Sequence, residues 1–317
     1  MASRGNFDQS TTADQVLEGI DIAGKHFLVT GGSSGLGAET ARALASKGAN
    51  VTITARNLEK AKQVAEGIHA ATGNGIAIEE LELGSFASIR AFATRINSSD
   101  KKIDVLINNA GVMACPHNTT EDGLELQFGS NHIGHFLMTN LVSESLVEGG
   151  RVVSLSSAGH KMAPVDFDDP NFEHREYDKW LAYGQAKTAN ALFAVGLNSR
   201  LAKRSIEAFA VHPGVIVTDL GRHLSEQDVL QLVESMGESM SYKSVEQGAA
   251  TQTLAATAPE LTGKGGSYLA NCKICELSAS DNDVADETTV RAYAVSKENA
   301  DRLWSLSEKI VAEKFRY

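Results

Sequence analysis

The chain has 317 residues, of which 42% are hydrophobic and 22% charged, and its formal net charge is −11. This composition excludes an intrinsically disordered chain and leaves enough apolar residues for a sizeable core. With 40 acidic residues against 29 basic ones, it also argues against a surface that binds nucleic acid or an anionic membrane.

Neither a secretion signal nor a membrane anchor is predicted, because residues 1–24 are polar and the apolar runs are far shorter than the roughly 20 residues that cross a bilayer. The three cysteines form an odd set, which argues against a disulfide framework and fits a reducing compartment. A cytoplasmic protein is therefore expected.

Short apolar runs alternate with amphipathic stretches, which is typical of a parallel sheet covered by helices on both faces. The expected strands, in chain order, are 26–30, 51–54, 76–83, 104–108, 151–155, 206–211 and 267–270. The expected helices between and after them are 35–47, 57–68, 85–96, 124–146, 179–202 and 244–256. This alternation predicts a doubly wound, Rossmann-like α/β fold of about seven strands.

A glycine-rich segment, Thr30-Gly31-Gly32-Ser33-Ser34-Gly35-Leu36-Gly37, joins the first strand to the first helix. Glycines permit a tight turn and let the backbone approach a phosphate, while the helix N-terminus offers N–H groups and a positive dipole end. The spacing is Gly-x-x-x-Gly-x-Gly rather than G-x-G-x-x-G. A dinucleotide site is predicted here, and a plain strand-to-helix turn is the alternative.

Arg56 follows the second strand, where an acidic residue would accept hydrogen bonds from the ribose hydroxyls of NAD. A guanidinium at this point suits a 2′-phosphate instead. NADP is therefore the predicted cofactor, and the alternative is that Arg56 is a solvated surface residue.

Tyr183 and Lys187 lie four residues apart in the expected helix 179–202, which places them on one face, one turn apart. An ammonium beside a phenol favours the phenolate, so the pKa of Tyr183 is expected to fall below its usual value of about 10. A phenolate suits alcohol oxidation beside a nicotinamide, and a phenol suits carbonyl reduction. With the glycine segment, this pair indicates an oxidoreductase.

Over roughly residues 24–268, the chain resembles the classical short-chain dehydrogenase/reductase family. Six segments resemble motifs of that family, in the family's order: the glycine segment, Asn108-Asn109-Ala110-Gly111, Asn131, Ser157, the Tyr183/Lys187 pair, and Pro213-Gly214-Val215 with Thr218.

The resemblance implies four catalytic residues, Asn131, Ser157, Tyr183 and Lys187. Tyr183 would pass the proton, Ser157 would position the substrate oxygen, and Lys187 would also hold the nicotinamide ribose. Asn131 would support a water, and Ser156 is a rival for the place of Ser157. The implied cofactor contacts are Gly31, Ser33, Ser34, Gly35, Leu36, Gly37, Arg56, Asn57, Glu82, Leu83, Asn109, Ala110, Gly111, Tyr183, Lys187, Pro213, Gly214, Val215 and Thr218.

Ser157 and Tyr183 are 26 positions apart, and the insert between them includes Asp166-Phe167-Asp168-Asp169-Pro170. This insert resembles the branch that contains retinol dehydrogenases and related bacterial and fungal reductases. Glu82 stands where that branch usually has an aspartate that holds the adenine. Membrane-associated members of the branch carry an N-terminal anchor, which is not predicted here.

The whole chain, 1–317, is expected to form one domain: a dinucleotide-binding and catalytic core (24–212), a substrate lid (213–243), and a closing strand with a C-terminal helix (244–317). In the lid, apolar residues including Met236 and Met240 recur at helical spacing, so they are expected to cover an apolar substrate. Packing on the core or on another subunit is the alternative. The long helices could also form a homodimer or homotetramer through a four-helix interface.

No metal site is predicted. Cys272 and Cys275 have the spacing of a zinc or redox pair, but no second pair accompanies them, so two free thiols are expected. His132 and His135 lack a carboxylate at matching spacing.

The predicted function is an NADP-dependent oxidoreductase that transfers a hydride between the nicotinamide and a secondary alcohol, ketone or aldehyde on an apolar substrate. A regulatory protein that binds NADP without turnover is the main alternative. A sugar-nucleotide epimerase fits less well, because the glycine spacing and the Asn-Asn-Ala-Gly motif argue against it.

Overall fold

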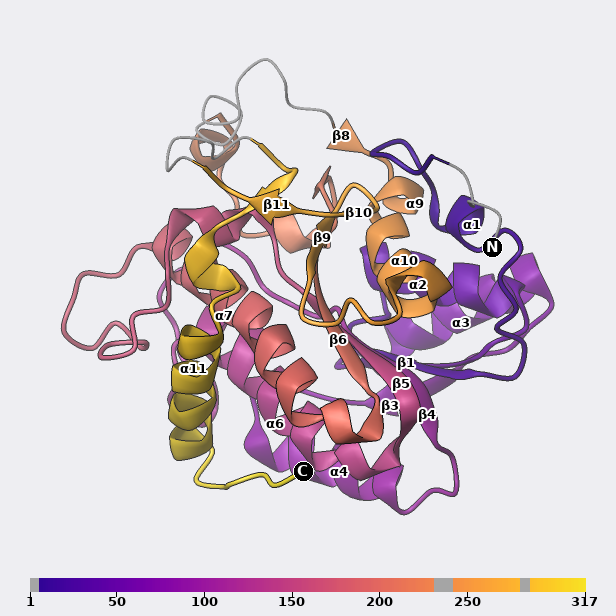
Figure 1. The fold of residues 1–317 in the computed structure, drawn as a ribbon, viewed down its shortest axis with the longest axis horizontal. Coiled ribbons are helices and arrows are strands. Elements are labelled where there is room, and N and C mark those ends of the chain that lie inside the picture. Colours follow the sequence, from indigo (N-terminus) through magenta and orange to yellow (C-terminus); the bar gives the residue numbers. More distant parts are fainter. Residues whose placement is uncertain (1–5, 231–241, 280–285) are drawn as a thin grey trace.

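The computed structural model describes residues 6–230, 242–279 and 286–317, and its centre is an eight-stranded sheet (Figure 1). The strand order is β10-β9-β6-β5-β4-β1-β2-β3. Seven strands run parallel: β1 (His26–Val29), β2 (Asn50–Ala55), β3 (Ala77–Glu80), β4 (Ile103–Asn108), β5 (Leu146–Leu155), β6 (Glu207–His212) and β9 (Tyr268–Ala270). β10 (Lys273–Ile274) pairs antiparallel with β9 at the edge. The predicted doubly wound sheet is confirmed, with one antiparallel strand added.

Helices cover both faces of the sheet because the strand residues alternate between two buried layers. In β6, Ala208 and Ala210 belong to one layer, whereas Phe209 and Val211 belong to the other. The first layer contains α4 (Phe86–Asn97), α6 (Gly134–Leu141) and α7 (Lys179–Arg200). The second contains α1 (Ala13–Val16), α2 (Gly35–Ser46), α3 (Leu58–Thr72) and α10 (Ala250–Thr257). Burial on both faces explains why the strands read as nearly unbroken apolar runs.

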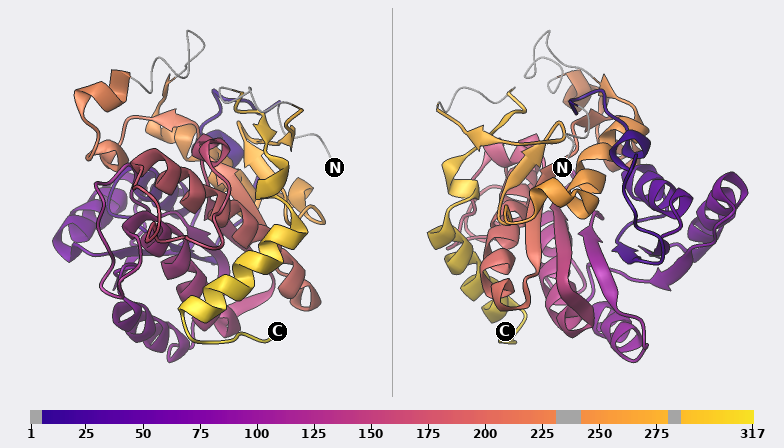
Figure 2. Two further views of the ribbon diagram at one scale, coloured as in Figure 1. Left: turned by 90° about the vertical axis from the view of Figure 1, so that its left-hand side faces the viewer. Right: turned by 45° about the vertical axis from the view of Figure 1, so that its right-hand side comes forward.

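The C-terminal helix α11 (Lys297–Ile310) lies along α7 and adds a further layer on that side (Figures 1 and 2). Its Trp304 packs edge-on against Phe136 of α6, with 4.9 Å between ring centroids. The Arg200 guanidinium of α7 lies 4.1 Å from the centroid of the same indole ring. The helices α6 and α7, which had been considered for a four-helix interface, therefore contact the chain's own C-terminal helix.

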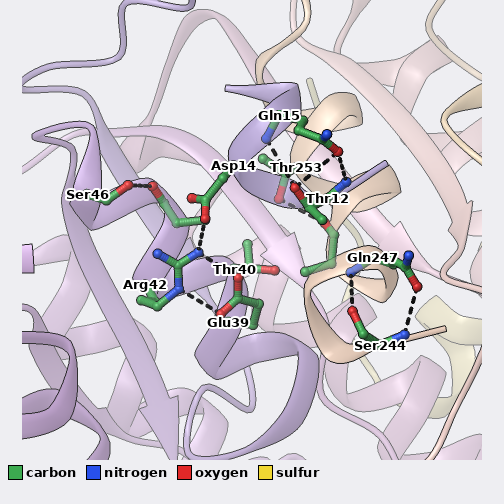
Figure 3. A network of polar contacts seen from close by, with 12 residues as sticks. Thr12, Asp14, Gln15, Glu39, Thr40, Arg42, Ser46, Ser244, Gln247 and Thr253 are labelled. Carbon is green, nitrogen blue, oxygen red and sulfur yellow. Dashed lines mark hydrogen bonds and ion pairs between the residues drawn. The ribbon is translucent and has the colours of Figure 1, made fainter. Parts of the chain in front are cut away.

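The N-terminal helix α1 is closed by its own capping contacts and joined to α2 by an ion pair (Figure 3). Thr12 and Gln15 form a capping box that satisfies backbone N–H groups at the start of α1. Arg42 of α2 contacts Asp14 of α1 and Glu39 of its own helix, each at 2.7 Å. These contacts hold α1 against the layer that carries the glycine segment.

The expected helix 124–146 is wrong in its extent. The structure has α5 (Leu126–Phe128), a π-helical turn over Gly129–Ile133, and then α6, which ends at Leu141. The chain then enters β5 at Leu146, because Leu146 pairs with Ile103 in the sheet. A π-helical turn is rare and often marks a functional segment.

Four short strands lie outside the main sheet, as two parallel pairs: β7 (Val215–Ile216) with β8 (Tyr242–Lys243), and β11 (Glu276–Leu277) with β12 (Thr289–Val290). The short helix α9 (Val245–Gly248) precedes α10. No helix in the described part of the chain combines the length and apolarity that crossing a membrane requires.

β1 lies between β2 and β4, so the strand order reverses here: the chain runs outwards through β2 and β3 and then returns to β4 on the other side of β1. At such a reversal of strand order, an open α/β sheet has a crevice outside the carboxyl ends of its strands. The segments that follow β1, β2, β4, β5 and β6 meet there, and they carry most of the predicted site residues.

Candidate active site

The glycine segment forms a tight turn between β1 and α2. Gly31 has a φ of 68°, in the left-handed region that favours glycine. A Cβ atom at Gly37 would lie 2.4 Å from the Gly31 carbonyl oxygen, so a larger residue cannot fit. Ser34 is the N-cap residue of α2, but its side chain makes no capping hydrogen bond. The N-terminus of a twelve-residue helix thus opens on the crevice with its positive dipole end.

The motif after β4 supports this turn from the neighbouring strand. The Asn109 side chain donates to the Thr30 carbonyl at 2.8 Å and to the Gly31 carbonyl at 3.3 Å. Thr30 Oγ1 in turn accepts from the Asn109 and Ala110 N–H groups at 2.9 and 3.0 Å. Asn109 therefore holds the two strand ends together as well as lining the crevice.

Arg56 and Glu82 form an ion pair at the ends of β2 and β3, with 3.2 Å between Nη1 and Oε2. Glu82 also accepts from the Gly84 N–H at 2.9 Å. The Arg56 side chain is 63% exposed, so its guanidinium can take a further anionic partner. Asn57 does not line the crevice. Its side chain caps α3 by accepting from the Lys60 N–H at 2.9 Å.

Ser157, Tyr183 and Lys187 come together as predicted. Ser157 follows β5, its Oγ accepts from the Gly159 N–H at 3.1 Å, and it lines the cleft together with Tyr183. Tyr183 and Lys187 lie one turn apart on α7, whose N-terminus is capped by Asp178. A Cβ atom at Gly159 would lie 2.8 Å from Tyr183 Cε1, so the glycine lets the ring pack against the serine turn.

Burial controls the ionisation of both α7 residues, which are each 4% exposed. It raises the pKa of Tyr183 to about 12, an effect partly offset by the Ser157 hydroxyl. It lowers the pKa of Lys187 to about 8. The expected fall in the pKa of Tyr183 is therefore wrong for this structure, because burial dominates. The Lys187 ammonium, which was expected to cause the fall, lies 5.6 Å from the phenol ring centroid and donates to the Leu155 carbonyl.

Ser156 makes different contacts from its neighbour. Its Oγ donates to the Lys187 backbone carbonyl at 2.7 Å, which ties the end of β5 to α7. Ser157 Oγ instead accepts from the Gly159 N–H, and the nearby Ser157 hydroxyl tends to lower the pKa of Tyr183. This difference favours Ser157 over Ser156 as the residue that contacts a substrate.

Asn131 lies in the π-helical turn and is fully buried. Its side chain accepts from the Val112 N–H and donates to the Val112 carbonyl, both at 2.8 Å. The side chain therefore acts as a clamp on the segment after β4, and the residue does not line the crevice. It remains close to it, because a Cβ atom at Gly111 would lie 3.1 Å from Asn131 Oδ1 and 3.6 Å from Lys187 Nζ.

The segment after β6 faces the glycine segment. Gly214 has a φ of 97°, which makes the turn after Pro213 possible. Thr218 packs on the glycine segment, since a Cβ atom at Gly35 would lie 3.4 Å from Thr218 Cγ2. The segment thus brings a second set of backbone groups towards the crevice.

These segments enclose a cleft of about 970 Å³. Every predicted cofactor residue except Asn57 lines it, as does Ser157. Met236 and Met240 lie outside the described residues, although Val229 and Tyr242 on either side of that gap do line the cleft.

Sequence reasoning missed several lining residues, including Met162, Trp180, His212 and Arg222. A signal existed for two of them. Trp180 precedes Tyr183 by one helical turn, and His212 immediately precedes the Pro213-Gly214 turn.

The histidines and cysteines that resembled metal ligands have other partners. Cys115, Cys272 and Cys275 are free thiols. His132 hydrogen-bonds to Ser307, whereas His135 hydrogen-bonds to Thr30. Within the described residues, no group of three or more His, Cys, Asp or Glu side chains could hold a metal ion.

Comparisons with known proteins agree with the geometry of the cleft. The family model described as short chain dehydrogenase matches residues 25–229. Human retinol dehydrogenase 13 is 39% identical over 92% of this chain and 85% of its own length. A probable oxidoreductase of Streptomyces lividans is 40% identical over 90% of this chain and 97% of its own.

A short chain dehydrogenase from Burkholderia cenocepacia, solved in complex with NADP, is 27% identical and superposes with a TM-score of 0.64. It covers 79% of this chain and 97% of its own. The family model, these relatives and the shared fold lead to one conclusion: the chain belongs to the short-chain dehydrogenase/reductase family, with retinol dehydrogenases among its relatives.

Proposed function

We propose that this protein is an NADP-dependent oxidoreductase that transfers a hydride between the nicotinamide and a carbonyl or alcohol carbon of an apolar substrate. One observation carries the proposal: Ser157, Tyr183 and Lys187 line the same cleft as the glycine segment. A protein that only bound a dinucleotide would have no need of a hydroxyl pair and a buried amine beside it.

The residues of the cleft fit a dinucleotide. Side chains are excluded at Gly31 and Gly37, where a Cβ atom would lie 2.9 Å from Ala110 Cα and 2.4 Å from the Gly31 carbonyl oxygen. This keeps backbone N–H groups and the α2 N-terminus accessible to a pyrophosphate. Arg56 supports NADP over NAD, because its exposed guanidinium suits a 2′-phosphate. The NADP bound to the Burkholderia relative supports the same choice.

When bound in the cleft, NADP would supply or accept the hydride. Tyr183 and Ser157 offer two hydroxyl groups to one substrate oxygen, and Tyr183 donates the proton during carbonyl reduction. Ser157 holds the oxygen in place. Lys187, fixed by its bond to the Leu155 carbonyl, places a cation beside the phenol.

The substrate is proposed to be apolar. Beyond the predicted residues, the cleft has an apolar part formed by Met113, Met162, Trp180, Leu224 and Val229, beside polar residues such as Arg222 and His223. The retinol dehydrogenases among the relatives act, as their name says, on a bulky apolar alcohol. Met236 and Met240 are proposed to extend this apolar surface.

The test is a spectrophotometric assay of NADPH oxidation with aromatic ketones, steroids and long-chain aldehydes. We expect turnover with at least one of these classes, and loss of that turnover in Tyr183→Phe. NADPH binding without oxidation by any carbonyl would instead favour a regulatory dinucleotide-binding protein.

A further inference from the structure

Buried side-chain rings that take no part in the proposed reaction hydrogen-bond to the turn that carries Ser157. The Tyr268 hydroxyl donates to the Ser157 carbonyl at 3.0 Å, and His160 Nδ1 lies 2.7 Å from the same oxygen. His212, the last residue of β6, binds the next peptide along, because its Nδ1 lies 3.1 Å from the Ala158 nitrogen.

The contact with Ala158 determines the proton positions on His212. A backbone N–H only donates, so Nδ1 must be the acceptor and the neutral ring must carry its proton on Nε2. Nε2 lies 3.2 Å from Oε1 of Glu287. Within the described residues, Nε2 has no partner with hydrogen-bond geometry, so this close contact with the carboxylate is its polar neighbour.

Glu287 provides a fixed negative charge at this point. Burial alone would raise the pKa of its carboxyl group, but the close contact with His212 and the nearby Lys243 ammonium bring the pKa below its usual value. Asn271 links the two charged groups, since it accepts from Lys243 and its Nδ2 lies 3.5 Å from Glu287 Oε2. The carboxylate that orients His212 therefore comes from the C-terminal part of the chain.

His212 also connects the two turns that meet at the reacting centre. Ala158 follows Ser157 directly, and Pro213-Gly214 follows His212 directly. The ring is 2% exposed, yet the residue lines the cleft. A shift of this ring would therefore move both the serine turn and the segment that faces the glycine segment.

We propose that His212 and Glu287 are positioning residues: Glu287 orients the His212 ring, and His212 Nδ1 holds the Ala158 N–H so that Ser157 keeps its place beside Tyr183 in the cleft. The inference rests on the proposed function, in which Ser157 positions the substrate oxygen. The alternative is that the pair only stabilises the fold.

Two substitutions at one position separate these cases. In His212→Asn, the side-chain oxygen can take the place of Nδ1 and still accept from Ala158. In His212→Gln, the amide can reach towards Glu287, but no acceptor remains at the Nδ1 position. A displaced hydroxyl lowers turnover more than binding, so we expect kcat to fall about tenfold or more in His212→Gln and to stay within about threefold of wild type in His212→Asn.

Glu287→Leu tests the second half of the pair. It removes the partner of Nε2, so we expect a fall in kcat of about threefold to tenfold with little change in NADPH affinity. Glu276→Leu is the matched control. Glu276 is an exposed carboxylate on β11, and β11 pairs with β12, which begins two residues after Glu287. The control should retain wild-type kcat.

A double-mutant cycle identifies the residue through which His212 acts. If His212 works through Ser157, adding His212→Gln to Ser157→Ala should lower kcat by less than about twofold. The proposal would be overturned if adding His212→Gln to Ser157→Ala lowered kcat by a further tenfold. It would also be overturned if His212→Asn and His212→Gln lost kcat equally and in proportion to a fall in melting temperature.

Hydrogen exchange at the Ala158 amide tests the contact without any turnover. We expect protection in wild type and in His212→Asn, and faster exchange in His212→Gln. Equal exchange in all three proteins would overturn the inference. Absence of carbonyl reduction in wild type would count against the proposed function alone, because the exchange measurement would still decide whether His212 holds this turn.

Discussion

At the scale of single residues, Tyr183 retains its proton because the protein buries it. Burial raises its pKa to about 12, and the Ser157 hydroxyl offsets only part of this rise. A neutral phenol is a proton donor, so the side chain is ready to protonate a carbonyl oxygen without a prior ionisation step. Alcohol oxidation would require the phenolate, which this burial disfavours.

Tyr183→Phe keeps the ring and removes the proton. We expect carbonyl reduction to fall by about two to four orders of magnitude, the usual contribution of a positioned acid. The dissociation constant of NADPH, measured by fluorescence or calorimetry, should change little, because the packing of the ring on Gly159 is kept. Turnover close to that of wild type would remove Tyr183 from the role of proton donor.

The pH dependence of carbonyl reduction should reveal the ionisation of Lys187. Burial lowers the pKa of Lys187 to about 8, whereas Tyr183 keeps its proton up to about 12. The lysine is therefore charged below pH 8 and loses its charge as the pH rises through that value, so kcat/KM for reduction should be level below about 8 and fall above it. In Lys187→Arg the fall should move to higher pH, because a guanidinium stays charged. A fall that begins only near the pKa of Tyr183 would contradict this role of Lys187.

Arg56 should determine the choice between NADPH and NADH. A charge-assisted hydrogen bond contributes about 1.5–3 kcal/mol, so Arg56→Asp should weaken NADPH by one to two orders of magnitude and spare NADH. Glu82→Gln is the control, since it removes the acidic partner of Arg56 and leaves the guanidinium in place. It should bind NADPH at least as tightly as wild type. A wild-type protein that prefers NADH would contradict the proposal directly.

At the scale of elements, Gly134 sets how closely α6 approaches the segment after β3. A Cβ atom at Gly134 would lie 2.3 Å from the Leu83 carbonyl oxygen, whereas one at Gly67 of α3 would meet nothing within 4 Å. Gly134→Ala should therefore destabilise the fold by about 1–3 kcal/mol. Gly67→Ala should stabilise it by about 0.4–1 kcal/mol, since alanine lowers the entropy of the unfolded chain. Chemical denaturation would measure both, and equal effects of the two substitutions would contradict this account.

The elements predictable from the sequence were those defined by local patterns. The parallel strands are short apolar runs, and α7 begins at Lys179 because Asp178 caps it. The extent of helix 124–146 was not predictable, because the side chain of Asn131 pairs with Val112, nineteen positions away, and Leu146 pairs with Ile103. Such partners leave no mark on the periodicity of the segment itself.

The same limit applies to the candidate site. Residues inside short motifs could be assigned to the cleft, because each motif follows a strand whose carboxyl end opens there. Asn57 also follows a strand, but its side chain accepts from the Lys60 N–H to cap α3, so it does not line the cleft. The pairs Arg56 with Glu82 and His212 with Glu287 join distant parts of the chain, so their partners could not be named before the fold was known.

At the scale of the whole molecule, the C-terminal helix completes the core on the side of α7. An aromatic cluster connects α11 and the residues after it to α6 and α7, and its members are Phe136, Phe193, Trp304, Phe315 and Tyr317. A second copy of the chain could use this face of α7 only by displacing α11. Any homodimer or homotetramer is therefore expected to use other surfaces.

Trp304→Ala tests whether α11 is part of this core. The indole is 4% exposed and packs on Phe136 and Arg200, so its removal should destabilise the protein by about 3–5 kcal/mol. Asp301→Ala is the control on the same helix, because Asp301 forms a half-exposed ion pair with Arg200 at 3.1 Å and should cost less than about 1 kcal/mol.

Detachment of α11 would expose the apolar face of α7, so the Trp304 variant should also self-associate at concentrations where wild type does not. Light scattering would detect this, and NADPH should still bind to the remaining folded protein, because the glycine segment belongs to the opposite layer. A loss of stability under about 1 kcal/mol, without self-association, would show that α11 lies on α7 without supporting it.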